Sequence, residues 1–176
     1  IVGNPNSSVV YHFSKNTGGD SNWGLQNNII GGTGTAFGQS AEIYGLEFII
    51  GSVGGTNANG LAFIFELDGS TISSSNDAEI IHPNDIETNS GYGQAVSISE
   101  VGFAIGAPKL DGEQYLDQGA TYINDEVKLI DEIQDPNRKN FGLAVDMDGD
   151  IVMIGAENRL FFYEKNKGET DNWGLL

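Results

Sequence analysis

The chain has 176 residues, the size of one domain, and carries 25 acidic against 8 basic residues, for a formal net charge of −17. This charge disfavours nucleic acid and anionic membrane surfaces as partners and favours cations or basic proteins, although it also promotes solubility. Cysteine is absent and no apolar run approaches the roughly 18–20 residues that span a bilayer, which excludes disulfides, thiol catalysis and membrane insertion by a helix.

Residues 1–36 are expected to form the back half of a four-stranded unit. Ile1–Asn4 aligns with Met153–Ala156, and Val9–Phe13 and Asn27–Ile30 are β-rich runs separated by a polar, glycine-containing connection. Because the chain starts in the middle of a repeat, we expect it to be a piece of a longer protein.

Residues 37–91 and 92–140 are each expected to form a complete unit. Both open with an aromatic–glycine pair and a hairpin of about 16 residues, at Phe37–Ser52 and Tyr92–Ala107. A loop follows each hairpin, glycine-rich in the first unit and long and acidic in the second. The third and fourth strands are expected at Leu61–Phe65, Ala78–Ile81, Ala120–Ile123 and Val127–Ile130.

Residues 141–176 are expected to form an incomplete unit, with a hairpin at Phe141–Ala156 and later strands at Leu160–Tyr163 and Trp173–Leu175. The dipeptide Asp148-Gly149 predicts a two-residue turn. Such a turn places Val145 opposite Val152 and Leu143 opposite Ile154. Both faces of this hairpin are largely apolar, so we expect both to be covered.

The matched glycines Gly3, Gly51, Gly106 and Gly155 recur about every 50 residues, a period typical of propeller blades. The sequence therefore predicts an all-β fold, a β-propeller of four-stranded antiparallel blades with about three and a half blades present. A fragment, a ring completed by two copies and a smaller closure all remain open. The repeated aromatic residues are expected to pack between blades, with sugar stacking as an alternative for the tryptophans: Phe37, Tyr92, Phe141, Trp23 and Trp173.

The repeated pattern resembles the FG-GAP repeat of integrin α-subunit propellers and of bacterial secreted and surface proteins. Its aromatic–glycine and glycine–alanine pairs are Phe141-Gly142 with Gly155-Ala156, and Tyr92-Gly93 with Gly106-Ala107. Phe37-Gly38 with Gly51-Ser52 departs in the last residue. The resemblance covers nearly the whole chain and implies an extracellular propeller, of seven blades in the family.

The alternating carboxylates Asp146, Asp148 and Asp150 are the candidate metal ligands. The resemblance implies calcium at such a loop, with ligands at its positions 1, 3, 5 and 9. Here position 9 is Ile154 and a glycine stands at position 4, whereas Ca²⁺ takes about six to eight oxygens. A plain hairpin turn with solvated carboxylates is the alternative, so we expect no cofactor other than a possible Ca²⁺.

Catalysis is not expected. His12 and His82 are the two histidines, and no nucleophile-elbow, zinc-protease or phosphate-loop motif is present. The resemblance implies that ligands bind loops on one face, namely those between second and third strands and the links between blades. The candidate ligand-binding residues are Asn57, Asn59, Lys109, Asp111, Glu113, Asp117 and Arg159.

Three functions follow as hypotheses. The first is a non-catalytic extracellular binding or adhesion module for a protein or glycan ligand. The second is a structural or assembly domain of a surface filament or large secreted protein, with neighbouring blades or a second copy as partners. The third is an accessory domain of a secreted enzyme.

Overall fold

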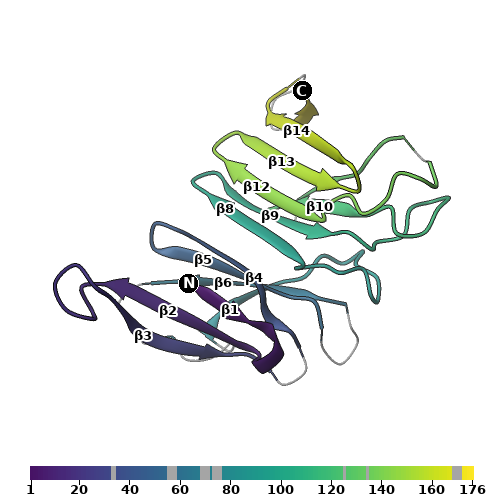
Figure 1. Ribbon diagram of the computed structural model, residues 1–176. Coiled ribbons are helices and arrows are strands. Elements are labelled where there is room, and N and C mark those ends of the chain that lie inside the picture. The colour runs from purple at the N-terminus through teal and green to yellow at the C-terminus, as the bar shows by residue number, and fades with distance from the viewer. Residues whose placement is uncertain are drawn as a thin grey trace.

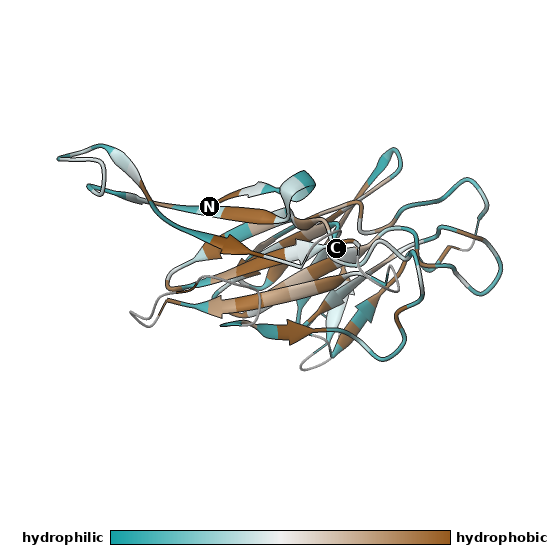
Figure 2. Cartoon of the chain, turned by 90° about the horizontal axis from the view of Figure 1, so that it is seen from below, coloured by the Kyte–Doolittle hydropathy of each residue, from teal (hydrophilic) through white to brown (hydrophobic). Residues whose placement is uncertain are grey.

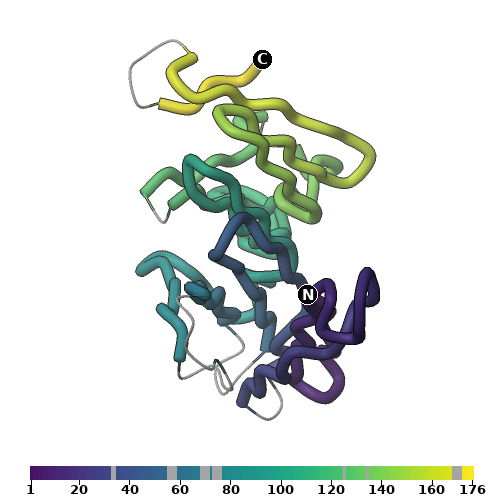
Figure 3. Tube along the Cα trace, turned by 90° about the vertical axis from the view of Figure 1, so that its left-hand side faces the viewer, coloured from purple at the N-terminus to yellow at the C-terminus, as the bar shows by residue number. Residues whose placement is uncertain are grey.

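The computed structural model describes residues 1–32, 35–54, 59–67, 72, 77–124, 126–133, 135–167 and 172–176. Its strands form four antiparallel sheets that follow one another in chain order, as Figures 1 and 3 show. Sheet one has three strands and sheets two, three and four have four strands each. The predicted all-β architecture of stacked propeller blades is confirmed.

Within each four-stranded sheet the strands are neighbours in chain order, so each strand pairs with the strands before and after it in the sequence. Sheet one is β1 (Val2–Asn4), β2 (Val9–Lys15) and β3 (Trp23–Ile30), with a 3₁₀ turn, η1 (Pro5–Ser7), between β1 and β2. Sheet two is β4 (Phe37–Tyr44), β5 (Glu47–Ser52), β6 (Leu61–Glu66) and β7 (Glu79–Ile81). Sheet three is β8 (Ala95–Ser99), β9 (Gly102–Ala107), β10 (Ala120–Ile123) and β11 (Val127–Leu129). Sheet four is β12 (Ala144–Asp148), β13 (Ile151–Ala156), β14 (Arg159–Lys165) and β15 (Trp173–Leu175).

A separate hydrophobic core fills each junction between consecutive sheets, and Figure 2 shows hydrophobic residues concentrated in the strands. The aromatic residue that opens each repeat lies at the centre of a junction, because Phe37, Tyr92 and Phe141 are at most 1% exposed. Phe37 contacts the edge of Phe63, with ring centroids 5.2 Å apart. Fully burying such a ring contributes about 1.5–3 kcal/mol, so the predicted packing role is confirmed.

The tryptophan prediction is half right. Trp173 is 8% exposed and packs in the junction between sheets three and four. Trp23 holds the corresponding place in sheet one but is 68% exposed. The prediction of packing is wrong for Trp23, because the face of sheet one that carries it meets no other sheet formed by the described residues.

The predicted turn of the last hairpin is wrong by one residue. Asp148 pairs with Ile151, so the turn is Gly149-Asp150 and Val145 lies opposite Ile154. Gly149 has φ of +53°, and glycine at the first central position is the requirement of a type II′ turn. The register moves by two residues, which changes the pairs but leaves each side chain on its predicted face.

The expectation that both faces of this hairpin are covered is also wrong. Met147, Val152 and Ile154 are buried against sheet three. On the opposite face, Ile151 and Phe162 are each 44% exposed and Leu160 is 62% exposed. Sheet four is the last in the stack, so no other sheet in the described part of the chain packs on its outer face (Figure 1).

The closest approach between sheets occurs where two glycines meet. The carbonyl oxygen of Gly142 lies so near Gly106 that a Cβ at Gly106 would overlap it. Gly93 makes the same contact with Gly51, and Gly38 makes it with Gly3. Glycine is therefore required on one side for space, and on the other because Gly38, Gly93 and Gly142 have φ of 80° to 88°.

Gly106→Ala is expected to destabilise the chain by more than about 3 kcal/mol, since its Cβ would overlap a backbone oxygen that cannot rotate away. The matched control is Gly155→Ala, where the nearest atoms belong to Ala144 of the same sheet and begin at 3.3 Å. That variant is expected to change the free energy of unfolding by less than about 1 kcal/mol. Urea denaturation measures both, and equal losses would show that the carbonyl contact does not matter.

Candidate ligand-binding site

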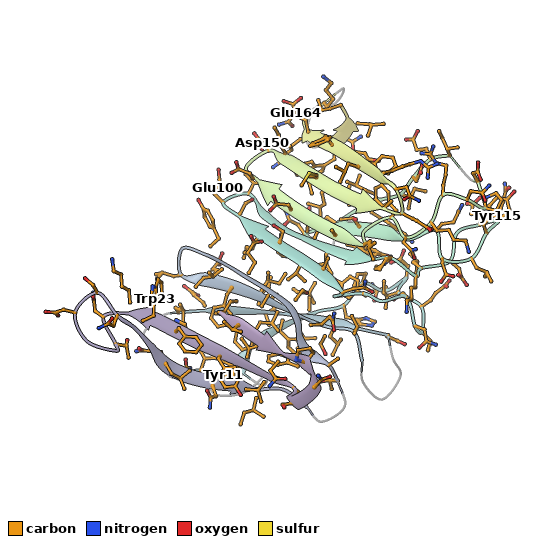
Figure 4. The ribbon with its side chains drawn as sticks, viewed as in Figure 1. Tyr11, Trp23, Glu100, Tyr115, Asp150 and Glu164 are labelled. Carbon is orange, nitrogen blue, oxygen red and sulfur yellow. The ribbon has the colours of Figure 1, made fainter. Side chains whose placement is uncertain are left out.

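Loops and links from neighbouring sheets are joined at one edge of the stack. The backbone N–H of Lys109 donates to the carbonyl of Ser90 at 2.8 Å, and the N–H of Glu157 donates to the carbonyl of Lys139 at 3.0 Å. In Figure 4, Tyr115 marks this edge and the turns near Glu100 and Asp150 lie at the opposite one. The loops and links that contribute these groups therefore lie together at one edge of the stack.

The acidic loop between β9 and β10 has a defined shape. The backbone N–H of Asp117 donates to the Oδ1 atom of Asp111 at 3.0 Å, and the N–H of Gly112 donates to the carbonyl of Tyr115 at 2.9 Å. Asp117 has φ of +56°, which a short side chain of this type tolerates. The N–H of Gly119 then closes the loop on the carbonyl of Leu110 at 2.8 Å.

A cavity of about 470 Å³ opens between this loop and the outer part of sheet three. The residues that line it are Leu110, Asp111, Gly112, Glu113, Gln118, Gly119, Lys128, Ile130, Asp131 and Glu132. Four of them are acidic and one is basic. The loop thus provides one wall, and the end of β11 with the following link provides the other.

Two of these charged residues already have partners. Lys128 Nζ lies 2.7 Å from Asp85 Oδ2 and also sits over the ring of Tyr122. Partial burial raises the pKa of Asp85, but the hydrogen bond and the positive charge of Lys128 outweigh it and lower the pKa overall. Arg138 donates to both carboxylate oxygens of Asp131 at 2.6 and 2.7 Å, which raises the pKa of Arg138.

The other acidic residues of the cavity have no basic partner in the described part of the chain. They are Asp111, Glu113 and Glu132, all exposed. Gln118 is 6% exposed, and its Oε1 atom has no hydrogen-bond donor among the described residues. A buried acceptor without a donor costs roughly 1–3 kcal/mol, so a hydrogen-bond donor entering the cavity would relieve that cost.

Tyr163 lies near the acidic wall of the cavity. Its hydroxyl donates to the carbonyl of Ile130 at 3.4 Å. Burial, together with the negative charges of Glu132 and Asp131, raises the pKa of Tyr163 to about 12. The phenol therefore stays neutral in the folded protein at a pH where the unfolded chain already ionises.

The raised pKa of Tyr163 predicts that the folded protein loses stability at high pH. The folded pKa of about 12 exceeds the ordinary value of 10.0, so the stabilisation is complete below pH 10 and is lost as pH rises toward 12. Tyr163→Phe cannot ionise, so the variant is expected to lose less stability over that interval than the wild type. Urea denaturation at pH 8, 10 and 11.5 provides the measurement, and parallel curves would contradict the burial of the phenol.

The structure brings together some of the predicted ligand-binding residues. Asp111 and Glu113 line the cavity, while Lys109 and Asp117 are in the same loop. Asn59 is at the neighbouring loop, where its carbonyl accepts a bond from Ser90 Oγ at 3.2 Å. Arg159 begins β14 and pairs with Ala156, so its placement in the loop was wrong because the connection ends at Asn158. Asn57 lies outside the described residues.

The candidate metal ligands lie at the opposite edge. Asp146 and Asp148 pair across β12 and β13 with Met153 and Ile151, and Asp150 occupies the turn. No group of three histidine, cysteine or acidic side chains that could hold a metal ion occurs in the described part of the chain.

Sequence reasoning missed half of the cavity. Lys128 and Ile130 were assigned to the fourth strand of their unit, and none of Lys128, Ile130, Asp131 and Glu132 was given a functional role. The acidic pair directly after the last strand was the available signal. Only the fold shows that this pair faces a loop that precedes it by about 20 residues.

A comparison with protein-family models supports the repeat assignment. Residues 76–124 match the model of the FG-GAP repeat. This segment of the chain is therefore similar to an FG-GAP repeat. The matched segment runs from β7 to the end of β10 and includes the whole acidic loop. FG-GAP repeats form β-propellers and are typical of extracellular proteins.

No curated protein matches the chain. Among the described residues, the structure holds no helix with the length and apolar character needed to cross a membrane.

Proposed function

We propose that this FG-GAP chain is a non-catalytic binding or adhesion module that acts outside the cell. It would present the loops of one propeller edge to a protein or glycan ligand. The cavity beside the acidic loop favours a protein ligand that inserts a lysine or arginine side chain. The observation that carries this proposal is the set of carboxylates without basic partners, beside the buried Gln118 acceptor.

The chemistry of the cavity supports a cationic group. A guanidinium or ammonium group offers several donors, which match the carboxylates of Asp111, Glu113 and Glu132 as well as Gln118 Oε1. The net charge of −17 would also accelerate the approach of a basic partner. The rigid sheets position the loop, as is common for binding surfaces.

The non-catalytic part of the proposal is supported by the histidines. His12 Nδ1 lies 3.1 Å from Asn27 Oδ1, and its ring stacks on Phe48. His82 packs beside the ring of Tyr92. These contacts give both side chains a packing role. No cofactor is proposed. Isothermal titration calorimetry with a calcium salt tests whether Ca²⁺ binds at Asp146, Asp148 and Asp150.

An octa-arginine peptide, used as the probe, is expected to bind the wild-type chain at low salt. Replacing the three unpaired carboxylates, in the variant Asp111→Asn/Glu113→Gln/Glu132→Gln, is expected to weaken binding about tenfold, since charged hydrogen bonds contribute about 1.5–3 kcal/mol each before solvent screening. Fluorescence anisotropy with a labelled peptide measures the affinity.

The matched control is Asp20→Asn/Glu47→Gln/Glu66→Gln, which removes the same charge from exposed positions in sheets one and two. It is expected to weaken binding less than about twofold. Equal losses in the two variants would mean that only the net charge attracts the peptide, and the cavity would then be rejected as the site.

An assembly role is the second candidate. The specific observation in its favour is the pair of uncovered apolar faces at the two ends of the stack. Trp23 is 68% exposed on sheet one, and Leu160 is 62% exposed on sheet four. Exposed apolar surface of this kind commonly marks an interaction site.

A further inference from the structure

The two junctions that join sheets two, three and four use the same polar contact. In one, Glu42 Oε2 accepts the backbone N–H of Ile98 at 2.8 Å. In the other, Ser97 Oγ accepts the backbone N–H of Met147 at 3.0 Å. Glu42 and Ser97 hold the same position of the repeat, the fifth after its opening aromatic residue. Each acceptor thus binds the first strand of the sheet that follows.

Sheet four carries the same position, and its contact is not made. Asp146 is the fifth residue after Phe141, lies on β12 and is exposed. Gly155 corresponds to Gly106, yet no carbonyl from another sheet is among its nearest atoms. The acceptor and the glycine that build each internal junction are therefore both present and unused on this face.

The apolar part of the junction is repeated in the same way. In sheet two, Ile49 and Ala62 face sheet three and are 0% exposed. The matching positions of sheet four are Met153, which is partly exposed, and Leu160, which is 62% exposed. The outer face of sheet four thus carries the residues that form one side of an internal junction, and no sheet among the described residues supplies the other side.

We infer that the outer face of sheet four is a docking surface for a further β-sheet of the same repeat, whose first strand opens with an aromatic–glycine pair. The carbonyl of that glycine would rest on Gly155. Asp146 would accept the backbone N–H of the sixth residue after the aromatic. This assignment is independent of the proposed binding function, because the loop cavity belongs to sheet three.

A second copy of residues 1–176 does not meet these requirements in the same way. A copy that continued the stack in the same direction would bring its sheet one to this face, and the strands β1, β2 and β3 of sheet one correspond to β13, β14 and β15. The described part of sheet one has no strand that corresponds to β12. It therefore offers neither the aromatic–glycine carbonyl nor the backbone N–H that Asp146 would accept.

The test appends residues 27–91 of this chain directly after Leu176. The register follows from the sequence, because Trp173-Gly174-Leu175 matches Trp23-Gly24-Leu25 and Leu176 takes the place of Gln26. The appended unit would supply the pair Phe37-Gly38. We expect the extended chain to unfold at a higher urea concentration than residues 1–176, in a single transition.

Asp146→Ala is expected to lower the urea midpoint of the extended chain but not that of residues 1–176. The amide of the appended Ile43, the sixth residue after Phe37, is expected to exchange its hydrogen at least about tenfold faster in that variant. Asp150→Ala, in the hairpin turn, is the matched control and should change neither readout. Gly155→Val should act like Asp146→Ala, and Gly155→Ala replaces it if the valine variant does not fold.

Equal effects of Asp146→Ala in both chains, or an appended unit that adds no stability, would overturn the inference. Light scattering of residues 1–176 gives an independent check. Self-association that Phe162→Asp abolishes would assign the face to a second copy, which also rejects the proposed occupant.

Discussion

The contact between a glycine carbonyl and a glycine Cα is the constraint on which the stack of sheets depends. It occurs at Gly38 on Gly3, at Gly93 on Gly51 and at Gly142 on Gly106. Backbones that approach this closely fix the spacing of the inner strands, and the aromatic residue beside each contact then fills the wider part of the wedge. The aromatic–glycine pair of one unit therefore contacts the matched glycine near the end of the hairpin, or of its remaining strand, in the preceding unit.

This constraint also places the loops. The link that precedes Phe141-Gly142 must reach sheet three, and its backbone bonds the loop between the second and third strands there. Asn140 donates to the carbonyl of Asp117 at 2.8 Å, and Phe141 donates to that of Gln118 at 2.9 Å. The end of the acidic loop is thus held by the junction itself. The cavity owes its shape to the same contacts that hold sheets three and four together.

The fold could be predicted from the sequence because the glycines and aromatics of the repeat act through steric requirements that few other residues satisfy. The turn at Gly149-Asp150 was misplaced because Asp148-Gly149 and Gly149-Asp150 both suit a two-residue turn. A type I′ turn at Asp148-Gly149 would need a positive φ at Asp148, whereas in the structure Asp148 pairs with Ile151 and only Gly149 of the two has a positive φ. Trp23 was misassigned because the residue type indicates only that a tryptophan prefers to be buried. Whether a neighbouring sheet is there to bury the side chain cannot be read from the residue itself. The cavity could be predicted only in part, because its walls are distant in sequence.

The alternating aspartates of β12 show how a local pattern and a repeat can indicate different roles for one residue. Spacing alone suggests ligands for a cation, since carboxylates at every second position of a strand share a face. Alignment with the other units places Asp146 where Glu42 and Ser97 accept backbone hydrogen bonds from the next sheet. A metal ligand would need oxygen atoms at the same place in every unit that binds, whereas a backbone acceptor needs only one oxygen within reach. Glutamate and serine both meet that simpler requirement in the two junctions of this chain, and the carboxylate of an aspartate has the same capacity to accept.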